Sequence, residues 1–176
     1  MEIHNILVPT DFSVDAEYAF QQALALAARE KARVSLLHIL PRSAVLCPEL
    51  GWFIQAQLAQ ELQAEAEQRL QAIAATQLIP IETLAVWGHP ATAICRIAKA
   101  YRIDLIVMSP HKRSRLARLF CGSVTERVVR SAPCAVLIVQ PSPPKTTRSE
   151  PTSVLQYLQQ HRAGQPGWWD SKVLTY

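Results

Sequence analysis

Five short apolar runs recur along the chain, and a stretch with helical spacing separates each run from the next. The runs are four to seven residues long and rich in β-branched residues, as expected of strands that are buried on both faces of a sheet. They cover residues 3–8, 34–40, 81–87, 105–108 and 134–139. Strands that alternate with helices are joined by right-handed crossovers, so the pattern predicts an α/β fold with a parallel sheet.

Amphipathic stretches lie between these runs. Ser13 is the predicted N-cap of a first helix that ends near residue 29, and a second helix with a Gln- and Glu-rich outer face is predicted over residues 50–75. Pro90 is expected near the first position of a third helix. The predicted inward-facing residues are Ala16, Ala19, Phe20, Ala23 and Ala27 in the first helix, Leu58, Leu62, Leu70 and Ile73 in the second, and Ile94, Ile97, Ala98 and Tyr101 in the third.

A fourth helix is predicted to begin at Gly122 and Ser123. Ser123 and Glu126 have the S-x-x-E spacing of a capping box. The loop before this helix contains no acidic residue and five basic ones, which are His111, Lys112, Arg113, Arg115 and Arg118. Free N–H groups and the positive end of the dipole at a helix N-terminus favour anions. The segment is therefore a candidate anion site at the carboxyl end of the fourth strand.

The segment of residues 104–140 resembles the universal stress protein family. In that family the fourth strand is followed by G-x-x-G, nine residues and then G-S or G-T, a motif that wraps the ribose and phosphates of ATP. Here Ser109 stands at the first glycine position, Lys112 at the second, and Gly122 with Ser123 at the last; the sequence TERVVRSAPCAVLIV then fits the family closely. Glycine allows a positive φ and a close approach of backbone to phosphate. We expect an altered site in which the Lys112 ammonium meets a phosphate.

The resemblance covers residues 1–140 and implies a doubly wound five-stranded parallel sheet of the adenine nucleotide alpha hydrolase-like type, with strand order 3-2-1-4-5. In such sheets ligands bind beyond the carboxyl ends of the strands, where the strand order reverses. Here that is the crevice between the first and fourth strands. The implied nucleotide-binding residues are Pro9, Thr10, Asp11, Ile39, Met108, Ser109, Lys112, Arg113, Gly122, Ser123 and Val124.

Several of these residues also suit a purely structural role. By resemblance Asp11 lies beside the adenine and Ile39 packs on its ring, but Asp11 equally suits a cap of the first helix and Ile39 the core. Ser123 alone would serve as a helix cap. The basic loop is as consistent with a solvated face as with phosphate binding by Lys112 and Arg113.

Other chemistry in the loop has weaker support. Binding to a nucleic-acid backbone is disfavoured because Phe120 is the only aromatic residue among the basic side chains. His111 has no suggestive partner that would make it a general base. Cys121 lies near basic residues and a helix N-terminus, which lower a thiol pKa, although an ordinary buried thiol is the simpler interpretation.

Composition sets wider limits. With 49% hydrophobic and 18% charged residues the chain is typical of a globular protein, and its net charge of +4 is low for a dedicated nucleic-acid binder. No apolar run approaches the roughly 20 residues of a membrane span, and the start has no signal-peptide pattern.

We expect a cytoplasmic binding or regulatory protein and not an enzyme, because no nucleophile–base set is visible. The expected cofactor is ATP or another adenine nucleotide, with no metal beyond Mg²⁺ accompanying it. The cysteines lack C-x-x-C spacing and are expected to be free thiols: Cys47, Cys95, Cys121 and Cys134.

Residues 141–176 differ in character from the rest and are predicted to form a C-terminal extension. The sequence PSPPKTTRSEPTS reads as an extended linker, a marginal short helix follows, and Trp168 and Trp169 lie near the end. The family resemblance implies a homodimer through the last strand, across residues 135–139, which is an uncharged edge. Alternatively the tail covers that edge, with the two tryptophans as anchors for self-docking or for a protein partner.

Two functional hypotheses follow. The first is a dimeric universal stress protein that binds ATP or a related adenine nucleotide in a stress response. The second is a nucleotide-free interaction module of the same fold that works through the last strand and the tail, and it is motivated by Ser109 and Lys112 at glycine positions.

Overall fold

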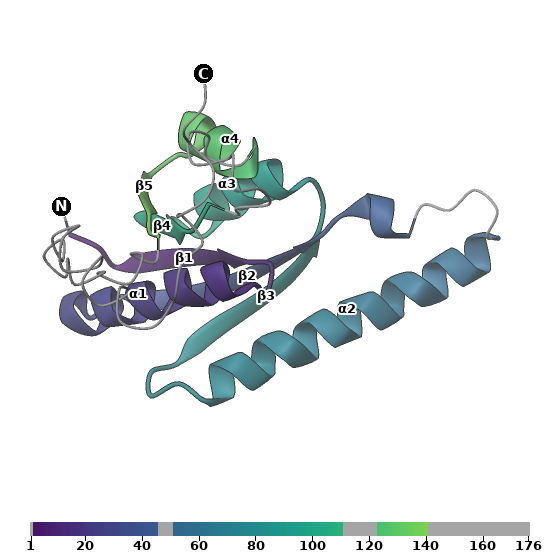
Figure 1. Cartoon of the computed structure of the whole chain (residues 1–176), viewed down its shortest axis with the longest axis horizontal. Helices are drawn as coiled ribbons and strands as arrows, with labels where there is room; N and C mark the ends of the chain where they lie inside the picture. The colour runs from purple at the N-terminus through teal and green to yellow at the C-terminus, as the bar shows by residue number, and fades with distance from the viewer. Residues whose placement is uncertain (1, 46–50, 111–122, 141–176) are drawn as a thin grey trace, which may run out of the picture. The chain divides into compact units, whose positions relative to one another are not determined.

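The structure is a computed structural model that describes residues 2–45, 51–110 and 123–140. It contains a five-stranded, all-parallel sheet with strand order β3-β2-β1-β4-β5 (Figure 1), which confirms the predicted fold class. The elements are β1 (Asn5–Thr10), α1 (Val14–Glu30), β2 (Arg33–Leu40), a short 3₁₀ helix η1 (Arg42–Ala44), α2 (Trp52–Ala75), β3 (Ile81–Trp87), α3 (Pro90–Ala100), β4 (Leu105–Met108), α4 (Ser123–Ser131) and β5 (Ala135–Ile138). The predicted extension over residues 141–176 lies outside the described residues.

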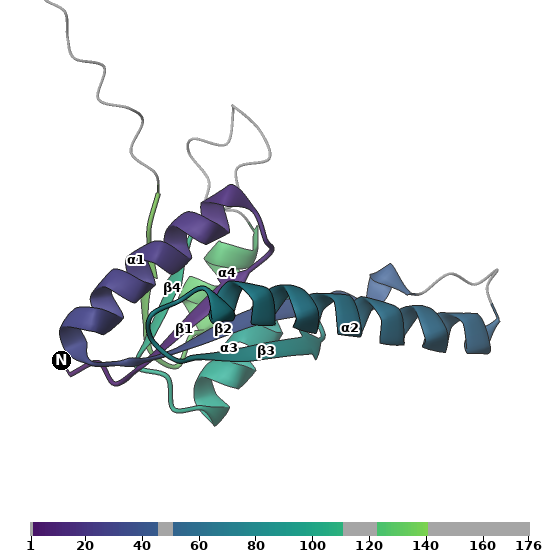
Figure 2. The same cartoon turned by 90° about the horizontal axis from the view of Figure 1, so that it is seen from below.

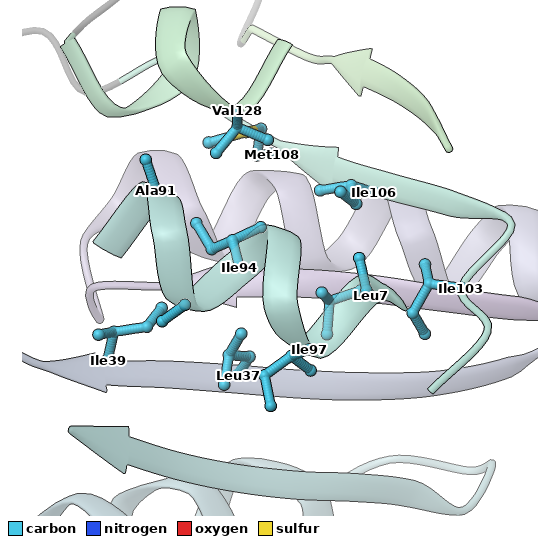
Figure 3. Packing of buried hydrophobic residues seen from close by; sticks show 12 residues of the cluster. Leu7, Leu37, Ile39, Ala91, Ile94, Ile97, Ile103, Ile106, Met108 and Val128 are labelled. Atoms are coloured by element: carbon cyan, nitrogen blue, oxygen red, sulfur yellow. The ribbon is translucent and has the colours of Figure 1, made fainter. Parts of the chain in front are cut away.

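The helices form one layer on each face of the sheet (Figures 1 and 2). Phe20 of α1 and Leu70 of α2 are buried in one hydrophobic cluster, and Ile94 of α3 and Val128 of α4 are buried in a second (Figure 3). Right-handed crossovers explain this division, because the chain moves from β1 toward β3 along one face and returns to β4 along the other.

The central strand β1 contributes to both clusters. Ile6 and Val8 face the α1–α2 side, and Leu7 between them faces the α3–α4 side. All three side chains have no solvent exposure. Successive side chains of a strand point to opposite faces, so an uninterrupted apolar run is what a strand buried on both faces requires.

Strand β1 is displaced from its predicted position, residues 3–8. It begins at Asn5 and continues through Thr10, which pairs with His38 of β2. The backbone N–H groups of His4 and Asn5 donate instead to Oδ2 of Asp104, each at 2.9 Å. This carboxylate therefore ties the start of β1 to the turn before β4.

Helix α1 follows its predicted pattern closely. Ser13 caps it, since Oγ accepts a hydrogen bond from the Ala16 N–H at 3.2 Å. The helix is followed by Lys31 in the left-handed region, with φ 56°. The predicted inner residues are all buried, namely Ala16, Ala19, Phe20, Ala23 and Ala27. In α3 the prediction holds for three of four residues, because Tyr101 is the C-cap and is 39% exposed.

Helix α2 covers the sheet only along its second half. Ala66 and Leu70 are its buried residues, whereas Leu58, Leu62 and Ile73 are half-buried. Hydrophobic spacing predicted an inner face along the whole helix. The earlier turns do not meet the sheet, because α2 begins beyond the carboxyl ends of the strands (Figures 1 and 2).

Strand β5 is an edge strand of the sheet, as predicted. It is paired with β4 on one side, from Leu105 with Ala135 to Met108 with Ile138. The Val139 N–H donates to the Met108 carbonyl at 3.0 Å and extends the contact by one bond. The exposed fraction of Leu137 is 41%, so an apolar side chain reaches solvent on this edge.

The carboxylate of Glu126, the second member of the predicted capping box, has a different partner. Ser123 is the first described residue of α4, and the residues just before it lie outside the described part of the chain. The carboxylate of Glu126 accepts a hydrogen bond from Arg130 at 2.8 Å, one turn later along the helix. A Glu four residues before an Arg forms a favourable i,i+4 pair, and that pair competes with reaching back to the cap.

Within residues 2–45, 51–110 and 123–140, no helix is long and apolar enough to cross a membrane.

Cys95 and Cys134 are free thiols, and burial raises the pKa of both. For Cys134 the nearby Asp104 carboxylate acts in the same direction. Neither residue has the lowered pKa of a reactive cysteine.

Asp104 gives a pH-dependent prediction. Hydrogen bonds from the backbone N–H groups of His4 and Asn5 lower its pKa. A carboxyl whose pKa is lower in the folded state stabilises the protein above its unfolded pKa of about 3.9, and this stabilisation is lost as pH falls through the folded pKa. We expect Asp104→Asn to lower the free energy of unfolding at pH 7 by about 1 kcal/mol, toward the low end for hydrogen bonds to a solvent-screened charge.

Urea unfolding at several pH values checks this. The difference between the wild type and Asp104→Asn should shrink steadily below about pH 4, because only the wild type has a titrating group there. A difference that stays constant down to pH 2 would show that the carboxylate charge does not stabilise the start of β1.

Candidate functional site

The sheet opens between its two central strands. Pairing between β1 and β4 is limited to Ile6 with Leu105 and Leu7 with Ile106, although β1 continues to Thr10 and β4 to Met108. On its other side β1 pairs with β2 along its full length. Pro9 has no N–H to offer to a neighbouring strand, which suits it to the end of the shared ladder. This is the position where the strand order reverses, and ligands of doubly wound sheets bind there.

The turn after β1 forms one wall of the opening. The Phe12 N–H donates to Thr10 Oγ1 and the Ser13 N–H donates to Asp11 Oδ1, each at 3.0 Å. Ser13 in turn caps α1. Asp11 therefore helps to order the entry into the helix, but its side chain is exposed at the carboxyl edge of the sheet. The two roles considered for Asp11 are compatible in this geometry.

Phe12 holds this turn in an uncommon conformation. Its φ is 61°, in the left-handed region, which is costly for a bulky side chain. Its ring lies 4.4 Å from the His38 ring, and the Arg69 guanidinium carbon lies 4.1 Å from its centroid. His38 Nδ1 donates to the Thr10 carbonyl at 2.8 Å. The turn is thus held from β2 and from α2 at once.

The opposite wall comes from β4 and α4. Ile39 of β2 and Met108 of β4 are buried in the α3–α4 cluster (Figure 3), and Val124 of α4 packs against it. These three apolar residues lie near the carboxyl ends of the strands and at the start of α4. At the end of β4, Ser109 Oγ is enclosed and has no hydrogen-bond partner among the described residues. An enclosed unpaired hydroxyl is uncommon and marks a place where a ligand atom could bind.

The starts of α3 and α4 are joined beside this wall. An Arg127 Nη1 group of α4 donates to Nε2 of His89, the residue before α3, at 3.2 Å. The bond therefore links the residue before α3 to the second turn of α4 on the α3–α4 side of the sheet.

The structure brings most of the predicted site residues to one edge. Pro9 and Thr10 end β1 and Asp11 follows them, and Met108 ends β4 and Ser109 follows it. Ile39 lies near the end of β2, and Ser123 and Val124 open α4. The basic loop lies outside the described residues, and with it lie Lys112, Arg113, Gly122, His111 and Cys121.

Three residues at this edge were missed from sequence: Phe12, His38 and Arg69. They line or support a separate hollow of about 290 Å³ on the α1–α2 side, bounded by Thr10, Phe12, Ser13, Glu17, Arg69, Ala72 and Ile73. A weak signal was present, since an aromatic residue directly after Asp11 interrupts a polar turn. The contact with Arg69 links residues 57 positions apart and has no local signature.

Metal chemistry was not expected beyond a Mg²⁺ ion accompanying a nucleotide. Among the side chains that the structure describes, no three of His, Cys, Asp or Glu are grouped to hold an ion.

Comparison with known proteins supports one family throughout. The model of the universal stress protein family matches residues 2–140. Universal stress protein MJ0531 of Methanocaldococcus jannaschii is 32% identical over 137 residues, which are 77% of this chain and 81% of the relative.

Solved structures show the same fold. The structure of hypothetical protein MJ0577, solved for a structure-based assignment of its biochemical function, has a TM-score of 0.70 and 28% identity, and the match covers 81% of this chain and 99% of that one. A universal stress protein in complex with cAMP has a TM-score of 0.56 and 25% identity, with 81% and 100% of the two chains covered.

The contact between Arg69 and Phe12 can be tested by stability. Arg69→Ala removes a cation–π contact, which is worth about 0.5–1 kcal/mol at an exposed site, and we expect the free energy of unfolding to fall by that amount. Arg69 also forms an ion pair with Glu65, at 3.7 Å and largely exposed. Glu65→Ala is the matched control, because it removes the ion pair and leaves the ring contact. Equal losses in the two variants, measured by urea unfolding, would contradict a role for the ring contact.

Proposed function

The chain belongs to the universal stress protein family, and from this premise we propose that it binds an adenine nucleotide in the opening between β1 and β4. The observation that carries the proposal is the early end of the β1–β4 ladder, with Asp11 on one wall and Ser109 on the other. The apolar floor formed by Ile39, Met108 and Val124 suits a flat base. The polar walls suit ribose and phosphate.

Each wall has a proposed role. Asp11 accepts hydrogen bonds from the adenine or the ribose, since its carboxylate is exposed at the edge. Ser109 donates its unpaired hydroxyl to a ribose or phosphate oxygen. The start of α4, from Gly122 through Ser123 and Val124, offers backbone N–H groups to a phosphate.

Lys112 and Arg113 complete the proposal for the phosphates. The family motif uses glycine where Ser109 and Lys112 stand, so close backbone approach is replaced here by side-chain contacts. A Lys ammonium meets phosphate as a point charge and needs no positive φ. The complex of a related protein with cAMP supports an adenine nucleotide as the class of ligand.

A regulatory role follows from this chemistry. A site made of one carboxylate, hydroxyls, backbone N–H groups and cations can bind a nucleotide without activating a water molecule. We infer a cytoplasmic protein whose occupancy follows the adenine nucleotide pool, with a Mg²⁺ ion accompanying any triphosphate.

Calorimetric titration with ATP, ADP, AMP and cAMP tests the site. We expect Asp11→Ala to weaken binding about tenfold, which corresponds to about 1.4 kcal/mol and is typical of losing a charged hydrogen bond. Asp15→Ala is the matched control, because it removes the same charge from the first turn of α1 and should leave affinity within about twofold. No heat and no competition with any of the four ligands at millimolar concentration would refute the proposal.

A second candidate function rests on the edge of β5. Its outward side is unpaired in the described chain, and Leu137, which pairs with Val107 of β4, is exposed on the α1–α2 face of the strand. Such an edge pairs readily with another strand, so a homodimer through β5 or the docking of Trp168 and Trp169 is proposed as a protein-interaction function. In this alternative the nucleotide site is not used.

The β5 contact is tested by Leu137→Lys. A charged side chain on an edge strand opposes edge pairing, and we expect the variant to lose one association step in sedimentation equilibrium. Val14→Lys is the control, because Val14 is 85% exposed at the start of α1 and is not part of the β5 strand. Unchanged mass in both variants would exclude an interface at this edge.

A further inference from the structure

The first turns of α2 stand apart from the rest of the described fold. Figures 1 and 2 both show this part of the helix extending beyond the sheet and the other helices. Trp52 is 81% exposed and Phe53 is 64% exposed. Large exposed aromatic groups that lie side by side are typical of a contact surface and not of a solvated helix.

These aromatic residues continue a defined face of the helix. Trp52, Ala56, Ala59 and Gln63 follow one another at intervals of four, three and four residues, so they lie in one row. The row has a bulky residue at one end and small residues in the middle. Small residues allow a second helix to approach closely, and the bulky residue needs a recess to fill.

A recess is present at the other end of the same row. A hollow of about 500 Å³ lies between α2 and β3, lined on the helix by Ala59, Gln60, Gln63, Ala64 and Glu67 and on the strand by Ala85 and Trp87. Most of its lining is apolar, and a tryptophan side chain already forms one side. It therefore suits an aromatic side chain.

The hollow also has an unpaired polar group. Gln63 Nε2 donates to Glu67 Oε1 at 2.7 Å and to the Ala85 carbonyl at 3.1 Å. Its Oε1 is enclosed and has no hydrogen-bond partner among the described residues. An indole N–H, which is a donor with no acceptor capacity, would pair with this oxygen once the Gln63 side chain turns its Oε1 toward the hollow.

We propose that the first half of α2 is a homodimer interface, in which two copies pack antiparallel and Trp52 of each fills the hollow of the other. An antiparallel register that sets Trp52 opposite Gln63 also sets Ala56 opposite Ala59. Bulky residues then meet recesses and small residues meet small residues. A two-fold contact requires such self-complementarity of one patch.

Charge and shape support a second copy as the occupant. Residues 51–60 carry no charged side chain, and Glu61 is the only charged residue within the paired segment 52–63. In this register Glu61 lies opposite Ile54 and not opposite the Glu61 of the other copy, so like charges do not meet directly. Gln55 and Gln60 lie opposite each other in the same register, and amide groups both donate and accept. Because this part of α2 extends beyond the sheet, the sheets of two copies lie at opposite ends of the helix pair. The contact is independent of nucleotide binding and of the β5 edge.

Sedimentation equilibrium of the full chain and its variants tests this interface. We expect Trp52→Ala to weaken self-association at least tenfold, since aromatic anchors in recesses dominate interfaces. Trp52→Phe, which keeps a ring and loses the N–H, should weaken it less. Ile54→Ala is the matched control from the same helical turn, because Ile54 lies about 200° around the helix from Trp52 and should leave association unchanged.

A charge-pairing experiment separates this contact from simple damage. Ala56→Glu places two like charges about 4.5 Å apart along the paired helices and should abolish the contact. Mixing Ala56→Glu with Ala56→Lys should restore it as a mixed dimer, which a misfolded variant would not do. Circular dichroism confirms that each variant is folded.

Three results would overturn the proposal. These are a monomeric wild type, association unaffected by Trp52→Ala and Ala56→Glu, or no mixed dimer from the two charged variants. If Trp52 proves protected from a fluorescence quencher in a monomer, residues 141–176 or another part of the same chain cover the face instead. If Leu137→Lys alone removes association, the interface is β5 and not α2.

Discussion

The fold depends on the burial of β1 between two helical layers. The candidate site depends on the early end of the hydrogen-bonded ladder between β1 and β4. Three consecutive side chains of β1, Ile6, Leu7 and Val8, have no exposure and anchor clusters on both faces. This fixes the sheet order and keeps the strand ends in register with β2. Beyond Leu7 the pairing with β4 stops, and the same strand that organises the core then supplies a wall of the opening.

The turn after β1 connects core and site. Phe12 has a left-handed backbone, and its ring contacts His38 of β2 and Arg69 of α2. Asp11 next to it is thereby held at the sheet edge by elements from the α1–α2 side, while Ser109 is held by β4. The proposed site is therefore supported by both layers, although its floor belongs to one of them. Binding residues that are held by rigid helices and strands keep a fixed position.

Much of the fold could be predicted from sequence, because apolar runs and helical spacing report burial directly. Strands β3 and β4 and the inner face of α1 were located correctly. The sequence-based predictions were wrong where a residue or element far away along the chain determines the local structure. The start of β1 is set by Asp104, about 100 residues away, and the exposure of the first turns of α2 is set by where the sheet ends. Neither the contact with Asp104 nor the end of the sheet can be recognised from the residues around β1 or α2 in the sequence.

The candidate site shows the same division. Residues in a recognisable motif, such as Asp11 and Ser109, were named from sequence, and they directly follow β1 and β4, the strands that border the proposed site. The residues that hold the turn, Phe12, His38 and Arg69, come from three elements and were missed. Their contacts depend on side-chain packing, which spacing along the chain does not report.

The central claim is that Lys112, Arg113 and the start of α4 allow nucleotide binding where the family has glycines. The most direct measurement is mass spectrometry of any ligand released on denaturing the natively purified full chain, with titration of the emptied protein by the ligand found. Our account predicts a recovered adenine nucleotide that rebinds with one site per chain. A protein that releases none and gives no response to added ATP would contradict it, and the fold would then have kept its opening but lost this ligand.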